Sequence, residues 1–132
     1  MSAEDHTVAV LGASPKADRY ANQAIRLLKT FHYSVVPIHP SHPEIEGLPV
    51  SRTLRDVRRP IHTLTVYVGP GRSLSLADDI VDLKPGRVIL NPGTESAELE
   101  ERLTRAGIPV IRGCTLVMLH SGQFEPNVRD PD

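Results

Sequence analysis

The stretch VAVLGAS, residues 8–14, decides the fold. It is a short apolar run that ends abruptly at Gly12, and a helix-like pattern begins a few residues further on. A strand that leads through a glycine turn into a helix is the first part of many phosphate-binding βαβ units. Glycine lets the backbone come close to a ligand, and free N–H groups at the start of a helix attract an anion. The stretch therefore predicts that Gly12, Ala13 and Ser14 form a phosphate-binding turn.

Further apolar runs and amphipathic segments alternate along the chain. Strands are predicted at residues 7–11, 34–38, 64–68, 87–90 and 109–111, with a very short one at 49–51 after a loop. Helices are predicted at residues 18–31 and 53–57, from a cap at Ser73 to about residue 84, and from a cap at Thr94 to Gly107. The first helix places Asn22 off its apolar face. Helices between successive strands predict a single α/β domain, with a doubly wound, mainly parallel sheet flanked by helices.

The composition limits the domain count and the partners. The chain has 132 residues, which suits one domain, and its net charge is −1, with 15 basic and 16 acidic side chains. We expect the domain to span residues 1–120 and residues 121–132, which are polar and contain proline, to form a flexible tail. The charge balance speaks against nucleic acid as a partner, and no apolar run is long enough for a membrane span. We therefore expect a cytoplasmic protein, and a protein partner or a homo-oligomer is compatible with the sequence.

Glycine, proline and small polar residues follow the ends of four predicted strands. These loops lie at residues 12–14, 39–40, 69–71 and 91–93. In open parallel sheets, ligands bind outside the carboxyl ends of the strands, where the strand order reverses. We expect the four loops to meet at that edge and to form a ligand site.

The second predicted strand argues against NAD as the ligand. A full dinucleotide fingerprint needs further glycines after Gly12, but Ser14 and Ala17 stand in those places. NAD-binding domains also place Asp or Glu after the second strand, to bind the ribose 2′-hydroxyl. This chain has His39 there, which can donate to a phosphate, and the nearest arginines in sequence are Arg52 and Arg55. The pattern favours a nucleotide with a phosphorylated ribose, and both coenzyme A and NADP fit that description.

The motifs together resemble those of the small, stand-alone CoA-binding domain family. The resemblance is carried by VLGASP at 10–15, Arg19 with Tyr20, YSVVPIHP at 33–40, LNPGT at 90–94 and Gly113 with Cys114. It runs from about residue 7 to about residue 120. The chain is also similar to the CoA-binding domain of the succinyl-CoA ligase α subunit. The resemblance implies a Rossmann-like fold with CoA, or an acyl-CoA, along the carboxyl edge of the sheet.

The resemblance also implies which residues surround the ligand. Gly12, Ala13 and Ser14 would line the pyrophosphate, with Lys16 and Arg19 as nearby cations. His39 and Pro40 would border the adenosine, and Gly69, Pro70 and Gly93 would lie along the exit path. On this basis Gly12→Val is expected to abolish binding, because the new side chain would occupy the ligand's place.

No catalytic constellation is visible in the sequence. Ser14 has no paired histidine and acid at readable spacing, and His39 with His42 lacks the further ligands of a metal site. The sequence therefore favours a non-catalytic CoA-binding protein, with an NADP- or other dinucleotide-dependent enzyme and a ligand-free interaction domain as alternatives. The single cysteine, Cys114, excludes an internal disulfide and is most simply a small buried thiol. If CoA binds with its pantetheine arm in reach, the CoA thiol could form a mixed disulfide with Cys114.

Overall fold

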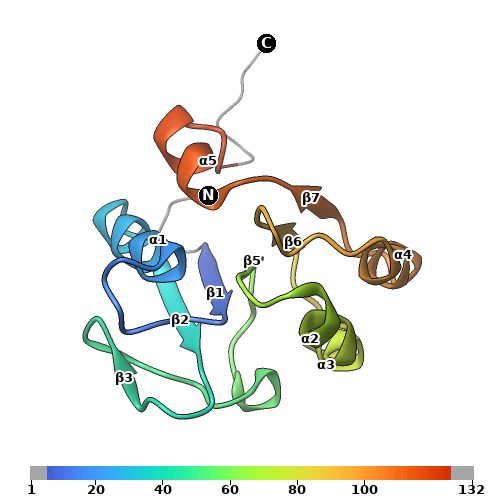
Figure 1. Cartoon of the computed structure of the whole chain (residues 1–132), viewed down its shortest axis with the longest axis horizontal. Helices are drawn as coiled ribbons and strands as arrows, with labels where there is room; N and C mark the ends of the chain where they lie inside the picture. Colours follow the sequence, from blue (N-terminus) through green and yellow to red (C-terminus); the bar gives the residue numbers. More distant parts are fainter. Residues whose placement is uncertain (1–5, 126–132) are drawn as a thin grey trace.

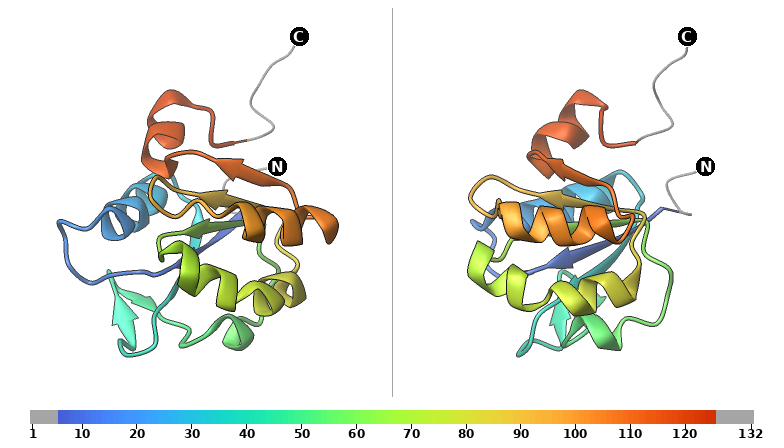
Figure 2. Two further views of the ribbon diagram at one scale, coloured as in Figure 1. Left: turned by 45° about the vertical axis from the view of Figure 1, so that its right-hand side comes forward. Right: turned by 90° about the vertical axis from the view of Figure 1, so that its right-hand side faces the viewer.

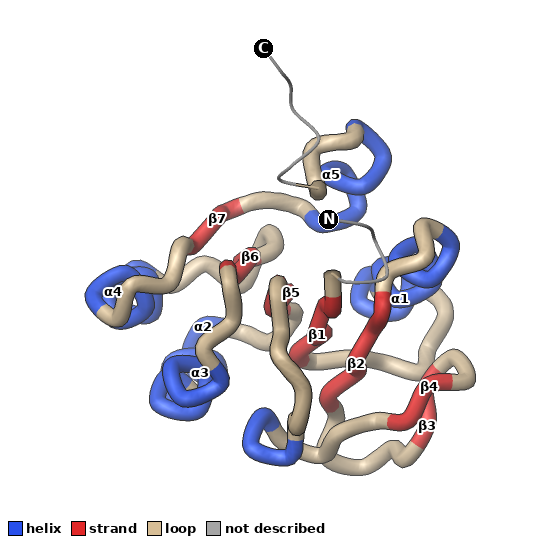
Figure 3. The backbone as a smooth tube through the Cα atoms, turned by 180° about the vertical axis from the view of Figure 1, so that it is seen from behind, coloured by secondary structure: helices blue, strands red, loops and turns tan. Residues whose placement is uncertain are grey.

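The main sheet is parallel throughout, which agrees with the mainly parallel sheet predicted. The computed structural model describes residues 6–125. Its main sheet has five strands in the order β2-β1-β5-β6-β7 (Figure 3). They are β1 (Thr7–Leu11), β2 (Ser34–Ile38), β5 (Thr63–Val66), β6 (Arg87–Leu90) and β7 (Val110–Arg112). The bounds of β1, β2 and β6 are those predicted, whereas β5 and β7 differ from their predicted bounds by one or two residues at an end.

The strand order reverses between β1 and β5. The chain passes from β1 outward to β2, then crosses back over β1 to β5 and continues to β6 and β7. Leu11 pairs with Val66, so the two strands end at the same level, and the Tyr67 N–H donates to the Leu11 carbonyl at 2.8 Å. The turn after Gly12 therefore lies beside the segment that begins at Tyr67, and this is where α/β sheets bind ligands.

Helices cover both faces of the sheet (Figure 1). One face packs against α1 (Tyr20–Thr30) and α5 (Thr115–Ser121), through residues such as Ile25, Leu28 and Leu119. The other face packs against α2 (Pro70–Ser75), α3 (Ala77–Leu83) and α4 (Ala97–Arg105). In the right-hand view of Figure 2, α2, α3 and α4 lie in front of the sheet and α1 lies behind it. This arrangement confirms the predicted α/β fold with helices on both sides.

Two predicted helix starts are wrong. The third predicted helix begins as α2 at Pro70, with Gly69 as its N-cap, and Ser73 is buried inside it with its hydroxyl donating to the Pro70 carbonyl. Proline is favoured at the first helical position, and here it overrides the serine. The N-cap of α4 is Ser96, whose Oγ accepts from the Leu99 N–H at 3.1 Å. The Thr94 hydroxyl instead donates to the Asn91 carbonyl.

The segment between β2 and β5 also differs from the prediction. It contains a small antiparallel hairpin, β3 (Glu44–Ile45) with β4 (Leu48–Pro49), in place of a loop and a strand at 49–51. Glu46 and Gly47 both have positive φ, which is typical of a two-residue hairpin turn. A single 3-10 turn, η2 (Leu54–Asp56), stands where a short helix was expected.

The packed part of the chain extends beyond the expected domain end at residue 120. That position lies inside α5, a short helix that was not predicted. After α5 the chain turns back at Gly122, and Phe124 is only 1% exposed. Residues 126–132 of the expected tail lie outside the described residues.

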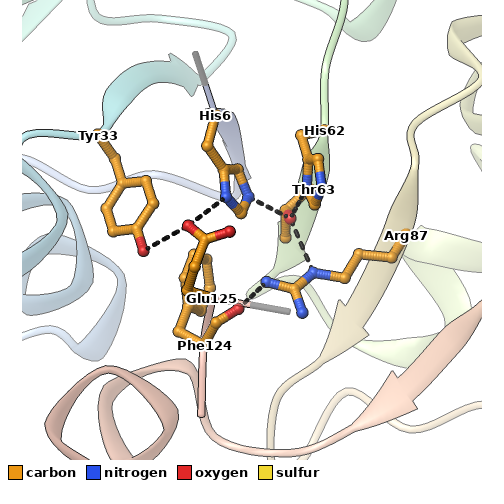
Figure 4. A network of polar contacts seen from close by, with 7 residues as sticks. All are labelled: His6, Tyr33, His62, Thr63, Arg87, Phe124 and Glu125. Carbon is orange, nitrogen blue, oxygen red and sulfur yellow. Dashed lines mark hydrogen bonds and ion pairs between the residues drawn. The ribbon is translucent and has the colours of Figure 1, made fainter. Parts of the chain in front are cut away.

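A network of polar contacts ties this C-terminal segment to the amino ends of the strands. We call it the amino-edge network, and it joins His6, Tyr33, His62, Thr63, Arg87, Phe124 and Glu125 (Figure 4). Nδ1 of His6 lies 3.3 Å from Oε2 of Glu125, and Nε2 lies 2.8 Å from Oγ1 of Thr63. The Tyr33 hydroxyl donates to the same Glu125 oxygen at 3.2 Å. The network lies at the opposite edge of the sheet from the predicted ligand site.

The amino-edge network predicts loss of stability in mild acid. Burial, reinforced by the neighbouring His62, lowers the pKa of His6 from 6.5 to about 4. Because the folded state disfavours protonated His6, the contribution of neutral His6 to stability is fully present above pH 6.5 and is lost as the pH falls from 6.5 towards 4. The loss is expected to reach on the order of 3 kcal/mol in the free energy of unfolding. Urea denaturation at pH 7.5, 5.5 and 4 measures it.

The matched variants are His6→Gln and, as a control on an exposed histidine, His120→Gln. His6→Gln is expected to flatten the pH dependence, and His120→Gln to leave it unchanged. Parallel pH profiles for wild type and His6→Gln would contradict the assignment to His6.

Candidate ligand groove at the carboxyl edge

Three cavities follow one another along the carboxyl edge of the sheet. The first, about 320 Å³, is lined by Leu11, Gly12, Ala13, Ile38, His39, Pro40, Arg52, Thr53, Leu54, Tyr67, Val68, Arg72 and Leu76. The middle one, about 330 Å³, is lined by Gly12, Ser14, Arg19, Tyr20, Ala21, Tyr67, Val68, Gly69, Pro92, Gly93 and Thr94. The third, about 360 Å³, is lined by Tyr20, Tyr67, Asn91, Pro92, Cys114, Leu116 and Val117. Neighbouring cavities share lining residues, and we call the three together the carboxyl-edge groove.

A larger hollow of about 550 Å³ lies elsewhere, against the outer side of β2. It is lined by Lys29, His32, Tyr33, Ser34, Val35, Val36, Leu48, Pro49, Val50, Ser51 and Arg59. It lies beside the amino-terminal half of β2, away from the point where the strand order reverses. Since α/β sheets bind ligands at that point, the smaller cavities are the better candidates.

Gly12 is required by the protein itself at this turn. Its φ is +87°, which favours glycine, and a Cβ built there would lie 2.8 Å from Cγ1 of Val68 and 3.1 Å from the carbonyl carbon of Tyr67. A side chain at Gly12 would thus collide with the segment after β5, and not first with a ligand. The N–H groups of Gly12 and Ala13 both donate to the Ile38 carbonyl, at 3.3 and 3.2 Å. These two amides, which were expected to hold a pyrophosphate, are therefore already used.

The start of α1 offers other donors. Arg19 is its N-cap residue, no side chain caps the helix, and no acidic residue lies in the first turn. Arg19, Tyr20 and Ala21 all line the middle cavity, so the positive end of the helix dipole borders it. Ser14 lines the same cavity and accepts from the Lys16 N–H at 3.1 Å, which leaves its hydroxyl able to donate. The middle cavity therefore suits an anion.

Asn22 holds the loop between β1 and α1 in place. The sequence pattern placed it off the buried face of the helix, but it is 0% exposed. Its amide nitrogen donates to the Ser14 carbonyl at 2.9 Å and to Glu46 Oε2 at 3.1 Å. Its amide oxygen accepts from Arg26 Nε at 2.7 Å. Nothing in the helix periodicity indicates this role, because Ser14 and Glu46 lie outside the helix.

The first cavity is cationic. His39 lines it, and its Nδ1 accepts from the Ser41 N–H at 3.0 Å, which leaves Nε2 as a donor toward other groups. Burial lowers the pKa of His39, and the positive charges of His42 and Arg72 lower it further. Arg52 also lines the cavity, with Nε 3.4 Å from the Pro40 carbonyl. No Asp or Glu is among the described residues that line any of the three cavities.

Arg55, the other arginine expected near the nucleotide, pairs with Asp79 at 3.1 Å and does not line the groove. Arg72 takes the place that the sequence analysis considered for Arg55. It comes from α2, and only the order of strands in the sheet brings that helix beside His39.

Eight of the ten residues expected at the site line the groove. They are Gly12, Ala13, Ser14, Arg19, His39, Pro40, Gly69 and Gly93. Lys16 and Pro70 do not line it, since Lys16 lies on the exposed loop before α1 and Pro70 is the exposed first residue of α2. Asn91 also lines the groove and belongs to the loop at 91–93 that was expected there, whereas Tyr20, Tyr67, Arg72, Leu116 and Val117 are lining residues that were not predicted. Contact with a ligand stays a prediction for all of them.

The described residues contain neither a candidate metal site nor a candidate membrane-spanning helix. No group of three or more metal-ligating side chains occurs within residues 6–125. Over the same residues, every helix is too short or too polar to cross a membrane.

A five-stranded parallel sheet with helices on both faces and a groove where the strand order reverses defines a Rossmann-like α/β domain. Within that class the chain belongs to a family of small CoA-binding domains, because the family model described as CoA binding domain matches residues 6–120. This confirms the family resemblance seen in the sequence.

Solved structures agree with this assignment. The crystal structure of an uncharacterized protein is 41% identical, with a TM-score of 0.85 over 90% of this chain and 98% of that one. A Thermus thermophilus protein, cell-free ID.343, is 32% identical, with a TM-score of 0.83 over 90% of each chain. The chain is also similar to part of acetyl-coenzyme A synthetase 1 of Ca. Korarchaeum cryptofilum, solved with phosphate and ADP. That match has 25% identity and a TM-score of 0.71, and it covers 81% of this chain and 25% of the synthetase chain.

Proposed function

We propose that this protein binds CoA or an acyl-CoA in the carboxyl-edge groove without catalysing a reaction. The observation that carries the proposal is the distribution of charge along the groove. Arg52 and Arg72 line the first cavity beside His39 as a further donor, Arg19 lines the middle one, and no charged side chain lines the third. Membership of the CoA-binding domain family supports the same ligand.

The groove fits the chemistry of CoA segment by segment. The 3′-phosphate of the adenosine would lie with Arg52 and Arg72, because guanidinium groups bind phosphate in paired hydrogen bonds. The pyrophosphate would lie in the middle cavity, at Ser14, Arg19 and the start of α1. The uncharged pantetheine arm would continue toward the third cavity. The distribution of charges supports this direction, since the reverse orientation would leave the phosphates beside apolar side chains.

The lining residues favour binding over catalysis. His39 is the single imidazole among the described lining residues, and it lies in the first cavity, at the adenosine end. Acyl transfer or hydrolysis at the thioester would need a base within hydrogen-bond reach of the other end. The sensing, storage or delivery of CoA fits this arrangement better than acyl transfer or thioester hydrolysis.

A thermal-shift titration of the full chain tests the proposal directly. The ligands are CoA, acetyl-CoA, NAD, NADP, FAD and ATP, each over a wide concentration range. A ligand that binds only the folded state stabilises it by about 2.7 kcal/mol at one hundred times its Kd. CoA species are expected to raise the midpoint, and the dinucleotides are not. A shift with NADP and none with CoA would replace the proposal with a dehydrogenase.

The cationic first cavity predicts discrimination between CoA and dephospho-CoA. CoA is expected to bind roughly tenfold more tightly, because hydrogen bonds to charged groups contribute about 1.5–3 kcal/mol. Arg72→Met is expected to remove most of that difference while affecting dephospho-CoA little. Arg55→Met is the matched control, since Arg55 lies outside the groove and pairs with Asp79. Isothermal titration of both ligands into wild type and the two variants gives the three affinity ratios, and an unchanged ratio in Arg72→Met would exclude Arg72 from the phosphate site.

A further inference from the structure

The third cavity has a different character from the other two. Its lining includes the side chains of Leu116 and Val117 from α5, the rings of Tyr20 and Tyr67, and no Asp, Glu, Lys, Arg or His. Burial raises the pKa of Tyr67 to about 12, so this phenol is uncharged at neutral pH. The cavity is therefore a neutral, mostly apolar space of about 360 Å³.

The side-chain amide of Asn91, which also lines the third cavity, is already hydrogen-bonded within the protein. The amide nitrogen of Asn91 donates to Thr65 Oγ1 at 2.7 Å and to the Val66 carbonyl at 2.9 Å. The amide oxygen accepts from the Thr115 N–H at 2.8 Å. Both protons of the amide are used inside the protein, so Asn91 fixes the start of α5 and has no donor left for a polar ligand group.

Exposed apolar side chains stand at the rim of the same cavity. Tyr20 is 70% exposed and Val117 is 61% exposed, and they account for two of the three large apolar side chains that the described residues expose strongly. Exposed apolar groups that gather around a cavity mark a surface that a ligand covers. The third cavity shares Tyr20, Tyr67 and Pro92 with the middle one, so its occupant is continuous with whatever lies there.

We propose that the third cavity receives the acyl chain of an uncharged acyl thioester, so that the ligand is an apolar acyl-CoA in preference to free CoA or a dicarboxylic acyl-CoA. This rests on the proposed binding of CoA in the groove, which places the thiol end here. An apolar chain would bury against Leu116 and Val117, and each buried methylene increases affinity roughly fourfold. A terminal carboxylate, as in a succinyl group, would enter a space that offers it no cation, where the buried and unpartnered Tyr67 hydroxyl can donate a single hydrogen bond.

The test is an isothermal titration series with CoA, acetyl-CoA, butyryl-CoA and succinyl-CoA. Butyryl-CoA is expected to bind on the order of tenfold more tightly than acetyl-CoA, because it buries two more methylenes. Succinyl-CoA is expected to bind more weakly than butyryl-CoA. Val117→Arg is expected to remove the butyryl advantage and to improve succinyl-CoA severalfold, since it places a cation in the cavity wall. His120→Arg adds the same charge to the same helix outside the cavity and is expected to change neither ratio.

The outcomes separate this inference from the function on which it rests. If no CoA species binds, both the acyl-chain inference and the proposed CoA binding are refuted. If CoA and butyryl-CoA bind equally, or succinyl-CoA binds best to the wild type, only the assignment of the third cavity to an acyl chain is refuted. Sedimentation velocity on the same samples tests a second copy of the chain as the occupant. Self-association that Val117→Arg abolishes, without any gain from an acyl chain, would also overturn the inference.

Discussion

Gly12→Val is expected to abolish CoA binding and to lower the free energy of unfolding by about 2–5 kcal/mol. Two effects combine at this position. The φ of +87° is unfavourable for a β-branched residue, and the new Cβ would lie 2.8 Å from Val68 and about as close to the Tyr67 backbone. Since Tyr67 lines all three cavities, the displaced segment would deform the whole groove.

The readouts are chemical denaturation for stability and isothermal titration for CoA. Gly71→Val is the matched control, because a Cβ at Gly71 would meet no atom within 4 Å and the residue lies in α2, outside the groove. If Gly12→Val is too unstable to titrate, Arg19→Met tests ligand binding separately from stability. It is expected to weaken CoA binding at least tenfold while Gly12 is unchanged. Wild-type stability and wild-type affinity in Gly12→Val would refute the role given to this turn.

The main sheet was predictable because its strands are short apolar runs that end close to a glycine or proline. Such a residue follows residues 7–11, 34–38 and 87–90 within two positions, and these strands match the prediction. Helix starts were less predictable where two good candidates lay within a few residues, as with Pro70 and Ser73 or Thr94 and Ser96. The short helix α5 spans too few residues to display a helical period.

The candidate site was predictable where it depends on strand ends, and unpredictable where it depends on helices from elsewhere. Gly12, His39, Gly69 and Gly93 each directly follow a strand or lie in the loop after it, so the α/β class alone brings them to one edge. Arg72 and Val117 reach the groove only because the strand order is β2-β1-β5-β6-β7 and α5 packs beside α1. Periodicity along one chain contains no information about that order.

The polar groups at the two edges of the sheet differ in their hydrogen bonding. Polar groups at the carboxyl edge have capacity left for a ligand, as Ser14 and Arg19 illustrate. Thr63, Arg87 and His6 at the amino edge are hydrogen-bonded within the protein, where Thr63 Oγ1 lies 2.8 Å from His6 Nε2 and 2.9 Å from His62 Nδ1. Substitution of Ser14 or Arg19 should therefore change binding more than stability, and substitution of the amino-edge polar residues should do the opposite.

Arg87→Met is expected to show the second behaviour most strongly, with a loss of about 2–4 kcal/mol in the free energy of unfolding. Arg87 is 6% exposed, and its Nε donates to Thr63 at 2.8 Å while its Nη2 donates to the Phe124 carbonyl at 2.5 Å. Its guanidinium also lies 4.7 Å from the centre of the Phe124 ring. Methionine keeps the length and volume of the side chain but leaves the buried Phe124 carbonyl without its donor.

Three measurements distinguish this role from a general effect of removing an arginine. Arg105→Met removes an exposed i,i+4 ion pair with Glu101 and is expected to change stability by less than about 1 kcal/mol. Limited proteolysis should cleave Arg87→Met faster near Phe124, because that segment loses its attachment to β6. The positive charge of Arg87 contributes to the low pKa of His6, so its removal should raise that pKa and reduce the loss of stability between pH 6.5 and 4. An Arg87→Met protein with the stability of Arg105→Met and an unchanged acid profile would show that the buried guanidinium does not hold the C-terminal segment to the sheet.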